Sequence, residues 1–92
     1  MSRKNINFMM RYVKTYLDGK SQRWEFDLDF DYELMNRWDD MCNENLEYAQ
    51  LFNDWIAEAG VDAGRKLSDE EYKELIREQY YEVKDIVAGG FQ

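Results

Sequence analysis

The stretch DYELMNRWDDMCNENLEYAQLFNDWIAEA, residues 31–59, decides the fold that the sequence predicts. When about 100° of rotation is assigned to each residue, its apolar side chains share one side of an α-helix and its polar side chains take the other. The apolar side consists of Leu34, Met35, Trp38, Met41, Cys42, Ala49, Phe52, Ile56 and Ala59. This pattern predicts an amphipathic helix that the rest of the chain packs against.

Asn43 and Asn45 interrupt the predicted helix over residues 31–59. Asparagine side chains compete for backbone hydrogen bonds within a helix, but they cap the start of a new helix well. The sequence therefore leaves open whether the helix continues or breaks into two near Asn43. Gly60 is expected to end it, because glycine is common directly after a helix.

Tyr48, Leu51 and Trp55 form a second apolar row beside the main one. A helix in the middle of a bundle contacts neighbours on two sides and needs such a wide apolar surface, and we favour this interpretation. If the row faces water instead, it is a ridge that binds a partner protein. The three residues are therefore also candidates for a binding site.

Residues 23–34 show a strict alternation of apolar and charged residues, which is typical of a β-strand with one buried side. The chain offers no second strand, and an unpaired strand leaves its backbone hydrogen bonds unsatisfied. We therefore expect a short extended segment near residues 23–30 that lies across the helices. There are two alternatives: the segment pairs with its copy in a homodimer, or the central helix starts earlier. Helical spacing is also met by Trp24, Leu28, Tyr32 and Met35.

If this segment is exposed, it is the best candidate for a partner-binding surface, because it combines aromatic and acidic side chains. The candidate residues are Trp24, Phe26, Asp27, Asp29 and Asp31. The three aspartates do not match an EF-hand calcium loop, which needs glycine at its sixth position and glutamate at its twelfth. No metal site is predicted from them.

An amphipathic helix is predicted over residues 5–18, and it is expected to end near Gly19. Its apolar stripe consists of Ile6, Met9, Met10, Val13 and Leu17. The opposite side of the helix gathers bases that are candidates for contact with nucleic acid, namely Arg3, Lys4, Arg11 and Lys14. The net charge of −8 argues against nucleic acid as the main partner.

Ser68 and Glu71 form the sequence signature of a capping box, which predicts a helix over residues 69–88. Four glutamates spaced four residues apart line its outer side, and this is most simply a solvated helix surface. Tyr81 points the same outward way and is the one aromatic residue there, so it is a further candidate for partner binding.

The composition limits the classes of function that the chain can have. Its 92 residues, 45% of them hydrophobic, suffice for a single helical domain over residues 1–92. The chain has no histidine, one cysteine and no glycine-rich phosphate loop, so the commonest general base, zinc ligands and redox pairs are missing. We predict that it is not an enzyme and that it uses no cofactor or metal. No signal peptide or membrane-spanning run is present, which indicates a cytoplasmic protein without membrane contact.

The negative charge is concentrated in the middle of the chain, where residues 24–63 hold twelve carboxylates and one arginine. Such a surface attracts basic partners. We therefore expect a small acidic protein-binding module, a regulator or inhibitor that covers a basic site on a partner protein. The alternatives are a nucleic-acid-associated protein that uses the basic N-terminal helix, and a structural homodimer.

The predicted fold is mainly all-α: a small three- to four-helix bundle with one short extended segment near residues 23–30. The side chains predicted to form its core are Met9, Val13, Leu17, Leu34, Trp38, Met41, Phe52, Ile56, Tyr72, Leu75, Ile76, Val83 and Ile86.

Overall fold

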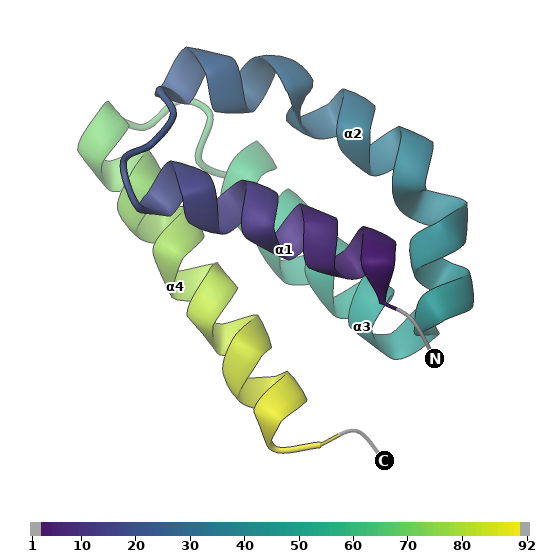
Figure 1. Ribbon diagram of the computed structural model, residues 1–92. Helices are drawn as coiled ribbons and strands as arrows, with labels where there is room; N and C mark the ends of the chain where they lie inside the picture. The colour runs from purple at the N-terminus through teal and green to yellow at the C-terminus, as the bar shows by residue number, and fades with distance from the viewer. Residues whose placement is uncertain (1–2, 91–92) are drawn as a thin grey trace. The chain divides into compact units, whose positions relative to one another are not determined.

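The computed structural model describes residues 3–90, and every regular element in this part of the chain is a helix. In chain order these are α1 (Lys4–Leu17), α2 (Arg23–Glu44), α3 (Leu46–Leu51), the π-helix η1 (Phe52–Asp62) and α4 (Asp69–Ala88), as Figure 1 shows. The prediction of a small all-α protein built from a few helices is confirmed.

The contacts between residues divide the chain into two compact units, residues 1–49 and residues 50–92. In the first unit α1 packs on α2, and in the second unit η1 packs on α4. Each unit therefore has its own pair of packed helices. The single domain over residues 1–92 stays a prediction.

Helix α1 matches the sequence prediction closely. The predicted apolar stripe is buried along its whole length, and Tyr16 is buried beside it. The helix ends before Gly19, whose φ of 80° places it in the left-handed region that glycine adopts without strain. The backbone N–H of Lys20 then donates to the carbonyl oxygen of Thr15 at 3.1 Å, which satisfies an acceptor at the helix end.

The prediction of an extended segment near residues 23–30 is wrong, because α2 already begins at Arg23. Gln22 and Glu25 form a capping box at its start, in which the Gln22 N–H donates to the Glu25 carboxylate at 3.1 Å. A helix satisfies its own backbone hydrogen bonds, whereas a lone strand cannot. Phe26 and Phe30, four residues apart, are both buried on one side of the helix. The alternative in which the central helix starts earlier is the correct one.

The apolar side predicted for residues 31–59 is also only partly correct. Met41 is buried, but Leu34, Trp38 and Cys42 are half-buried, and Met35 faces water. The physical reason is that polar residues of α2 contact α1 directly, through hydrogen bonds and a cation–π contact described below. Helix α2 is therefore rotated about its axis relative to the orientation that its apolar pattern predicts.

The sequence left open whether the helix breaks near Asn43, and the structure shows that it does, at Asn45. This residue leaves the helical conformation with φ −167° and ψ 104°. Its side-chain Oδ1 accepts a hydrogen bond from the backbone N–H of Tyr48 at 3.0 Å, so it caps the following helix α3.

The second unit contains an 11-residue π-helix, η1, in which the turns are wider than in an α-helix. At its end the N–H of Ala63 donates to the carbonyl oxygen of Glu58, five residues earlier, at 3.1 Å. The prediction that Gly60 ends the helix is wrong, since η1 continues to Asp62. Its buried residues recur at spacings of four and five, as a π-helix requires: Phe52, Ile56, Ala57, Gly60 and Val61. Ala59, which the α-helical pattern placed inside, is exposed.

Helix α4 runs over the predicted residues, and its capping box is present. The Ser68 hydroxyl oxygen accepts a hydrogen bond from the Glu71 N–H at 3.2 Å.

Of the thirteen predicted core residues, all are buried except Leu34, Trp38, Leu75 and Ile86, which are half-buried. Buried residues that the predicted core omits are Ile6, Met10, Tyr16, Phe26, Phe30, Tyr48, Ala49, Ala57, Val61 and Tyr80.

Candidate functional site

A row of four large apolar side chains lies on the water-facing side of α2. Trp24, Leu28, Tyr32 and Met35 are exposed by 64%, 70%, 65% and 79%, respectively. Their spacing of four, four and three residues places them on one side of the helix, over about 16 Å of its length. Single exposed apolar residues are common on protein surfaces, whereas a continuous row of large ones is less usual and makes this side of α2 a candidate interaction surface. We refer to these four residues as the α2 outer face.

The packing of α2 on α1 explains why this row points away from α1. The rings of Phe26 and Tyr16 stack with their centroids 4.5 Å apart, and those of Phe26 and Tyr12 stack at 5.4 Å. These contacts fix the rotation of α2 about its own axis. Leu28 follows Phe26 by two residues, or about 200° around the helix. The outer face is therefore directed away from the α1 contact.

Carboxylates border the outer face. Helix α2 contains eight acidic residues and two arginines. Glu25, Asp29 and Asp31 are exposed, while the half-buried Asp27 lies 4.0 Å from Arg23 in an ion pair between Oδ2 and Nε. The other arginine, Arg37, is engaged with α1. The outer face is thus an apolar row with a negatively charged border.

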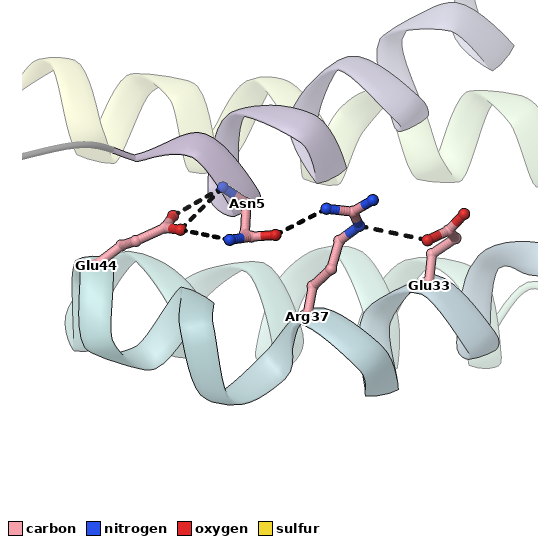
Figure 2. A network of polar contacts seen from close by, with 4 residues as sticks. All are labelled: Asn5, Glu33, Arg37 and Glu44. Atoms are coloured by element: carbon pink, nitrogen blue, oxygen red, sulfur yellow. Dashed lines mark hydrogen bonds and ion pairs between the residues drawn. The ribbon is translucent and has the colours of Figure 1, made fainter.

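A polar network holds the end of α2 against the start of α1, and Figure 2 shows its four residues. The carboxylate of Glu44 accepts hydrogen bonds from the backbone N–H of Asn5, at 3.0 and 2.9 Å, and from that of Ile6, at 2.9 Å. These are N–H groups of the first turn of α1, which have no acceptor within the helix itself. Glu44 therefore caps α1 from a position 38 and 39 residues later in the chain.

Arg37 extends this network along the contact between the two helices. Its Nη1 donates to the Asn5 side-chain oxygen at 2.7 Å, and its Nε donates to the Glu33 carboxylate at 3.3 Å. The guanidinium carbon also lies 3.5 Å from the centroid of the Phe8 ring, in a cation–π contact. This row of polar side chains occupies positions that the sequence pattern assigned to solvent.

The surroundings of Glu44 change its acidity in two opposing ways. Partial burial acts to raise the pKa of the carboxyl group, whereas the hydrogen bonds from Ile6 and Asn5 stabilise the charged form. The net result is a pKa below the ordinary value. The capping contact is therefore made by the ionised carboxylate.

A pocket of about 340 Å³ lies between α1 and the first half of α2. The residues that line it are Phe8, Arg11, Tyr12, Thr15, Ser21, Glu25, Phe26 and Asp29. The Tyr12 hydroxyl donates a hydrogen bond to the backbone carbonyl of Phe26 at 3.0 Å. Burial, together with the negative charges of Asp29, Glu33 and Asp27, raises the pKa of Tyr12 to about 12.

The structure separates the candidate residues of the segment 23–34. Trp24, Asp29 and Asp31 are exposed on α2, but Phe26 is 2% exposed and packs on α1, which removes it from any binding surface. The strand pattern grouped Trp24 with Phe26, and the helix places them on different sides. Leu28, Tyr32 and Met35 are missing from the candidates, although their helical spacing with Trp24 was visible in the sequence.

The other partner-binding candidates are distributed over α3, η1 and α4. Tyr48 is buried, and its ring lies 5.4 Å from the Arg3 guanidinium carbon. Leu51 is half-buried, whereas Trp55 on η1 and Tyr81 on α4 are partly exposed. None of these residues belongs to the α2 outer face.

The basic residues considered for nucleic-acid contact are all at or near α1. Arg3, Lys4 and Arg11 are exposed, and Lys14 forms an ion pair with Asp18 at 2.6 Å.

Within residues 3–90, no group of three or more cysteine, aspartate or glutamate side chains is placed to hold a metal ion. No helix in the same range is long and apolar enough to cross a membrane. No protein-family model, curated protein sequence or solved structure matches this chain.

Proposed function

We propose that this protein is a small acidic protein-binding module and that the α2 outer face is its binding surface. The observation that carries the proposal is the row of four exposed apolar side chains on one side of a helix. A helix of this kind binds a partner by placing its apolar row in a groove or against an apolar helix. Large aromatic side chains such as Trp24 and Tyr32 commonly contribute most of the binding free energy in such interfaces.

The charge around the outer face determines which partners suit it. The exposed carboxylates Glu25, Asp29 and Asp31 favour a partner with basic residues around an apolar centre, because complementary charges accelerate association and exclude wrong partners. The protein then acts as a regulator or inhibitor that covers a basic site on its partner.

A second copy of this chain is a poor partner for the same surface. Eight carboxylates against two arginines give each α2 helix an excess of negative charge, so two outer faces repel each other. The homodimer through paired strands also loses its basis, since residues 23–30 are helical.

A capture experiment in lysate of the source organism tests the proposal. The bait proteins are the wild type, an outer-face variant that combines Leu28→Ser with Tyr32→Ser, and a control that combines Leu46→Ser with Leu67→Ser. Leu46 and Leu67 are also exposed apolar residues, but they lie outside α2. We expect a basic protein that the wild type and the control capture and the outer-face variant does not.

Treatment of the lysate with nuclease distinguishes the nucleic-acid alternative. If capture disappears after nuclease treatment, and also after charge reversal at Arg11 and Lys14, the basic side of α1 is the binding surface and the proposal is wrong. Capture that is equal for all three bait proteins also contradicts it.

A further inference from the structure

We propose that the pocket between α1 and α2 binds the guanidinium group of an arginine side chain supplied by the basic partner. This inference rests on the proposed function, because it names the chemical group that the partner inserts beside the outer face. Three features of the pocket lead to it: aromatic walls, two carboxylates and a position next to the α2 outer face.

The walls of the pocket are aromatic. Phe8 and Tyr12 of α1 stack with their centroids 6.3 Å apart, and Tyr12 stacks on Phe26 of α2 at 5.4 Å. The faces of aromatic rings attract cations, and the planar guanidinium group stacks on them especially well. The molecule already contains such a pair, since the guanidinium of Arg37 lies over the ring of Phe8.

Two carboxylates add negative charge to the same pocket. Glu25 accepts one hydrogen bond from the Gln22 N–H, and its carboxylate retains further acceptor positions. Asp29 has no ion-pair partner among residues 3–90. A carboxylate and a guanidinium group can form two parallel hydrogen bonds, which an ammonium group cannot reproduce. Burial is the main cause of the raised pKa of Tyr12, and the negative charge of Asp29 adds to it.

Arg11 is the one basic residue that lines the pocket, and it opposes the binding of a cation. Its guanidinium group forms no ion pair with any residue that the structure describes. One positive charge thus faces two negative charges. The proposal therefore predicts opposite effects on the affinity for a cation. Removal of a carboxylate should weaken binding, whereas removal of the Arg11 charge should strengthen it.

The position of the pocket connects it with the outer face. Glu25 directly follows Trp24 in α2, and Asp29 directly follows Leu28, so each carboxylate lies about 100° around the helix from an outer-face residue. Both carboxylates therefore lie on the side of α2 between the outer face and the residues that contact α1. A partner seated on the outer face can therefore place one arginine side chain in the pocket.

Titration of the 92-residue protein with a small arginine compound, followed by NMR, tests the inference without the partner. The compound is N-acetyl-arginine N-methylamide. Its matched control is the citrulline analogue, which has the same shape but no charge. We expect saturable shifts of the ring resonances of Phe8, Tyr12 and Phe26 with the arginine compound only.

Two variants give the sign of the charge effect. Asp29→Asn should raise the Kd of the arginine compound by roughly fivefold, and Arg11→Gln should lower it by a similar factor. Both residues are exposed and outside the ion pairs of α1 and α2, so the variants should keep the fold, which the backbone spectrum checks. Equal binding of citrulline, no effect of Asp29→Asn, or weaker binding in Arg11→Gln overturns the inference. Equal affinity for the corresponding lysine compound also overturns the inference, because the pocket would then show no preference for a guanidinium group over an ammonium group.

The two proposals can fail separately. If a protein is captured through the outer face but the arginine compound does not bind, only the inference about the pocket is wrong. If the arginine compound binds with the expected signs and no capture depends on the outer face, the proposed function is wrong. The outer-face variant should bind the arginine compound with unchanged Kd, since Leu28 and Tyr32 do not line the pocket.

Discussion

The carboxylate of Glu44 accepts hydrogen bonds from both the backbone N–H and the side-chain amide of Asn5, at 2.9 and 2.8 Å. The two residues lie 39 positions apart, at the end of α2 and the start of α1. This contact satisfies donors that the helix leaves unpaired, and it sets where the two helices meet (Figure 2). It has no counterpart in the local sequence pattern.

Glu44→Gln should lower the free energy of unfolding by about 1–2 kcal/mol, as the loss of a helix cap usually does. The amide keeps one acceptor but loses the charge that suits the positive end of a helix. Urea unfolding followed by circular dichroism measures the difference. Glu78→Gln, at an exposed position in the middle of α4 and away from both helix ends, is the control and should change the stability far less. Equal stability of Glu44→Gln and the wild type contradicts the capping role.

The same contact should make the stability dependent on pH in a defined direction. The folded-state pKa of Glu44 lies below its ordinary value, so its contribution is complete above about pH 4.3, the unfolded value, and is lost as the pH falls through the folded pKa. The difference in Tm between wild type and Glu44→Gln should therefore shrink on acidification below about pH 4.3. Thermal melts between neutral and acid pH measure it. A difference in Tm that increases as the pH falls would contradict this account of Glu44.

Phe30→Ala should destabilise the protein more than Trp38→Ala does. The Phe30 side chain is fully buried and packs on Phe26 and Tyr12, so its removal should cost about 3–5 kcal/mol. Trp38 is only half-buried, so its truncation leaves a smaller cavity. The sequence pattern alone predicts the opposite order, because it places Trp38 in the core and omits Phe30. Chemical unfolding of the two variants decides between the two orders.

Gly64→Ala should destabilise the second unit by about 1–3 kcal/mol. A Cβ atom at Gly64 would lie 2.9 Å from the carbonyl oxygen of Gly60 and 3.0 Å from the Tyr72 ring, and the backbone oxygen cannot easily move away. Gly89→Ala is the matched control, since its nearest neighbours lie at 3.5 Å or more and its φ of −74° suits alanine. Comparable melting temperatures for both variants contradict the close packing of the turn at Gly64 against Gly60 and Tyr72.

Local signals were sufficient to predict the parts of the fold that depend on neighbouring residues in the chain. The capping box at Ser68 predicts the start of α4, and Gly19 marks the end of α1, because both act on the backbone within a few residues. The break at Asn45 follows the same logic, since the side chain caps the helix that it precedes.

The rotation of α2 could not be predicted, because it depends on partners far along the chain. Arg37 and Glu44 are charged residues that the apolar pattern leaves out of the core, yet they contact α1 through hydrogen bonds and a cation–π pair. The spacing of apolar residues predicts which side of a helix is buried only where apolar side chains make the contact. The sequence therefore placed Met35 inside and grouped Phe26 with Trp24, and both assignments changed the candidate site.

The pattern of residues 23–34 was ambiguous for a different reason. The segment alternates apolar and charged residues, as a strand does. It also has apolar residues at helical spacing, at Trp24, Leu28 and Tyr32. The spacing of apolar residues therefore cannot decide between strand and helix. The capping box of Gln22 and Glu25 and the contact with α1 decide for the helix. The π-helix is a comparable case, since spacings of four and five residues differ little from those of an α-helix.

The affinity for the captured basic partner, measured by isothermal titration calorimetry, tests the central claim most directly. The outer-face variant, Leu28→Ser with Tyr32→Ser, should bind at least about tenfold more weakly than the wild type, because it loses two of the four exposed apolar side chains. The control with Leu46→Ser and Leu67→Ser should bind as the wild type does. Unchanged affinity in the outer-face variant, or an equal loss in the control, would contradict the assignment of α2 as the binding surface.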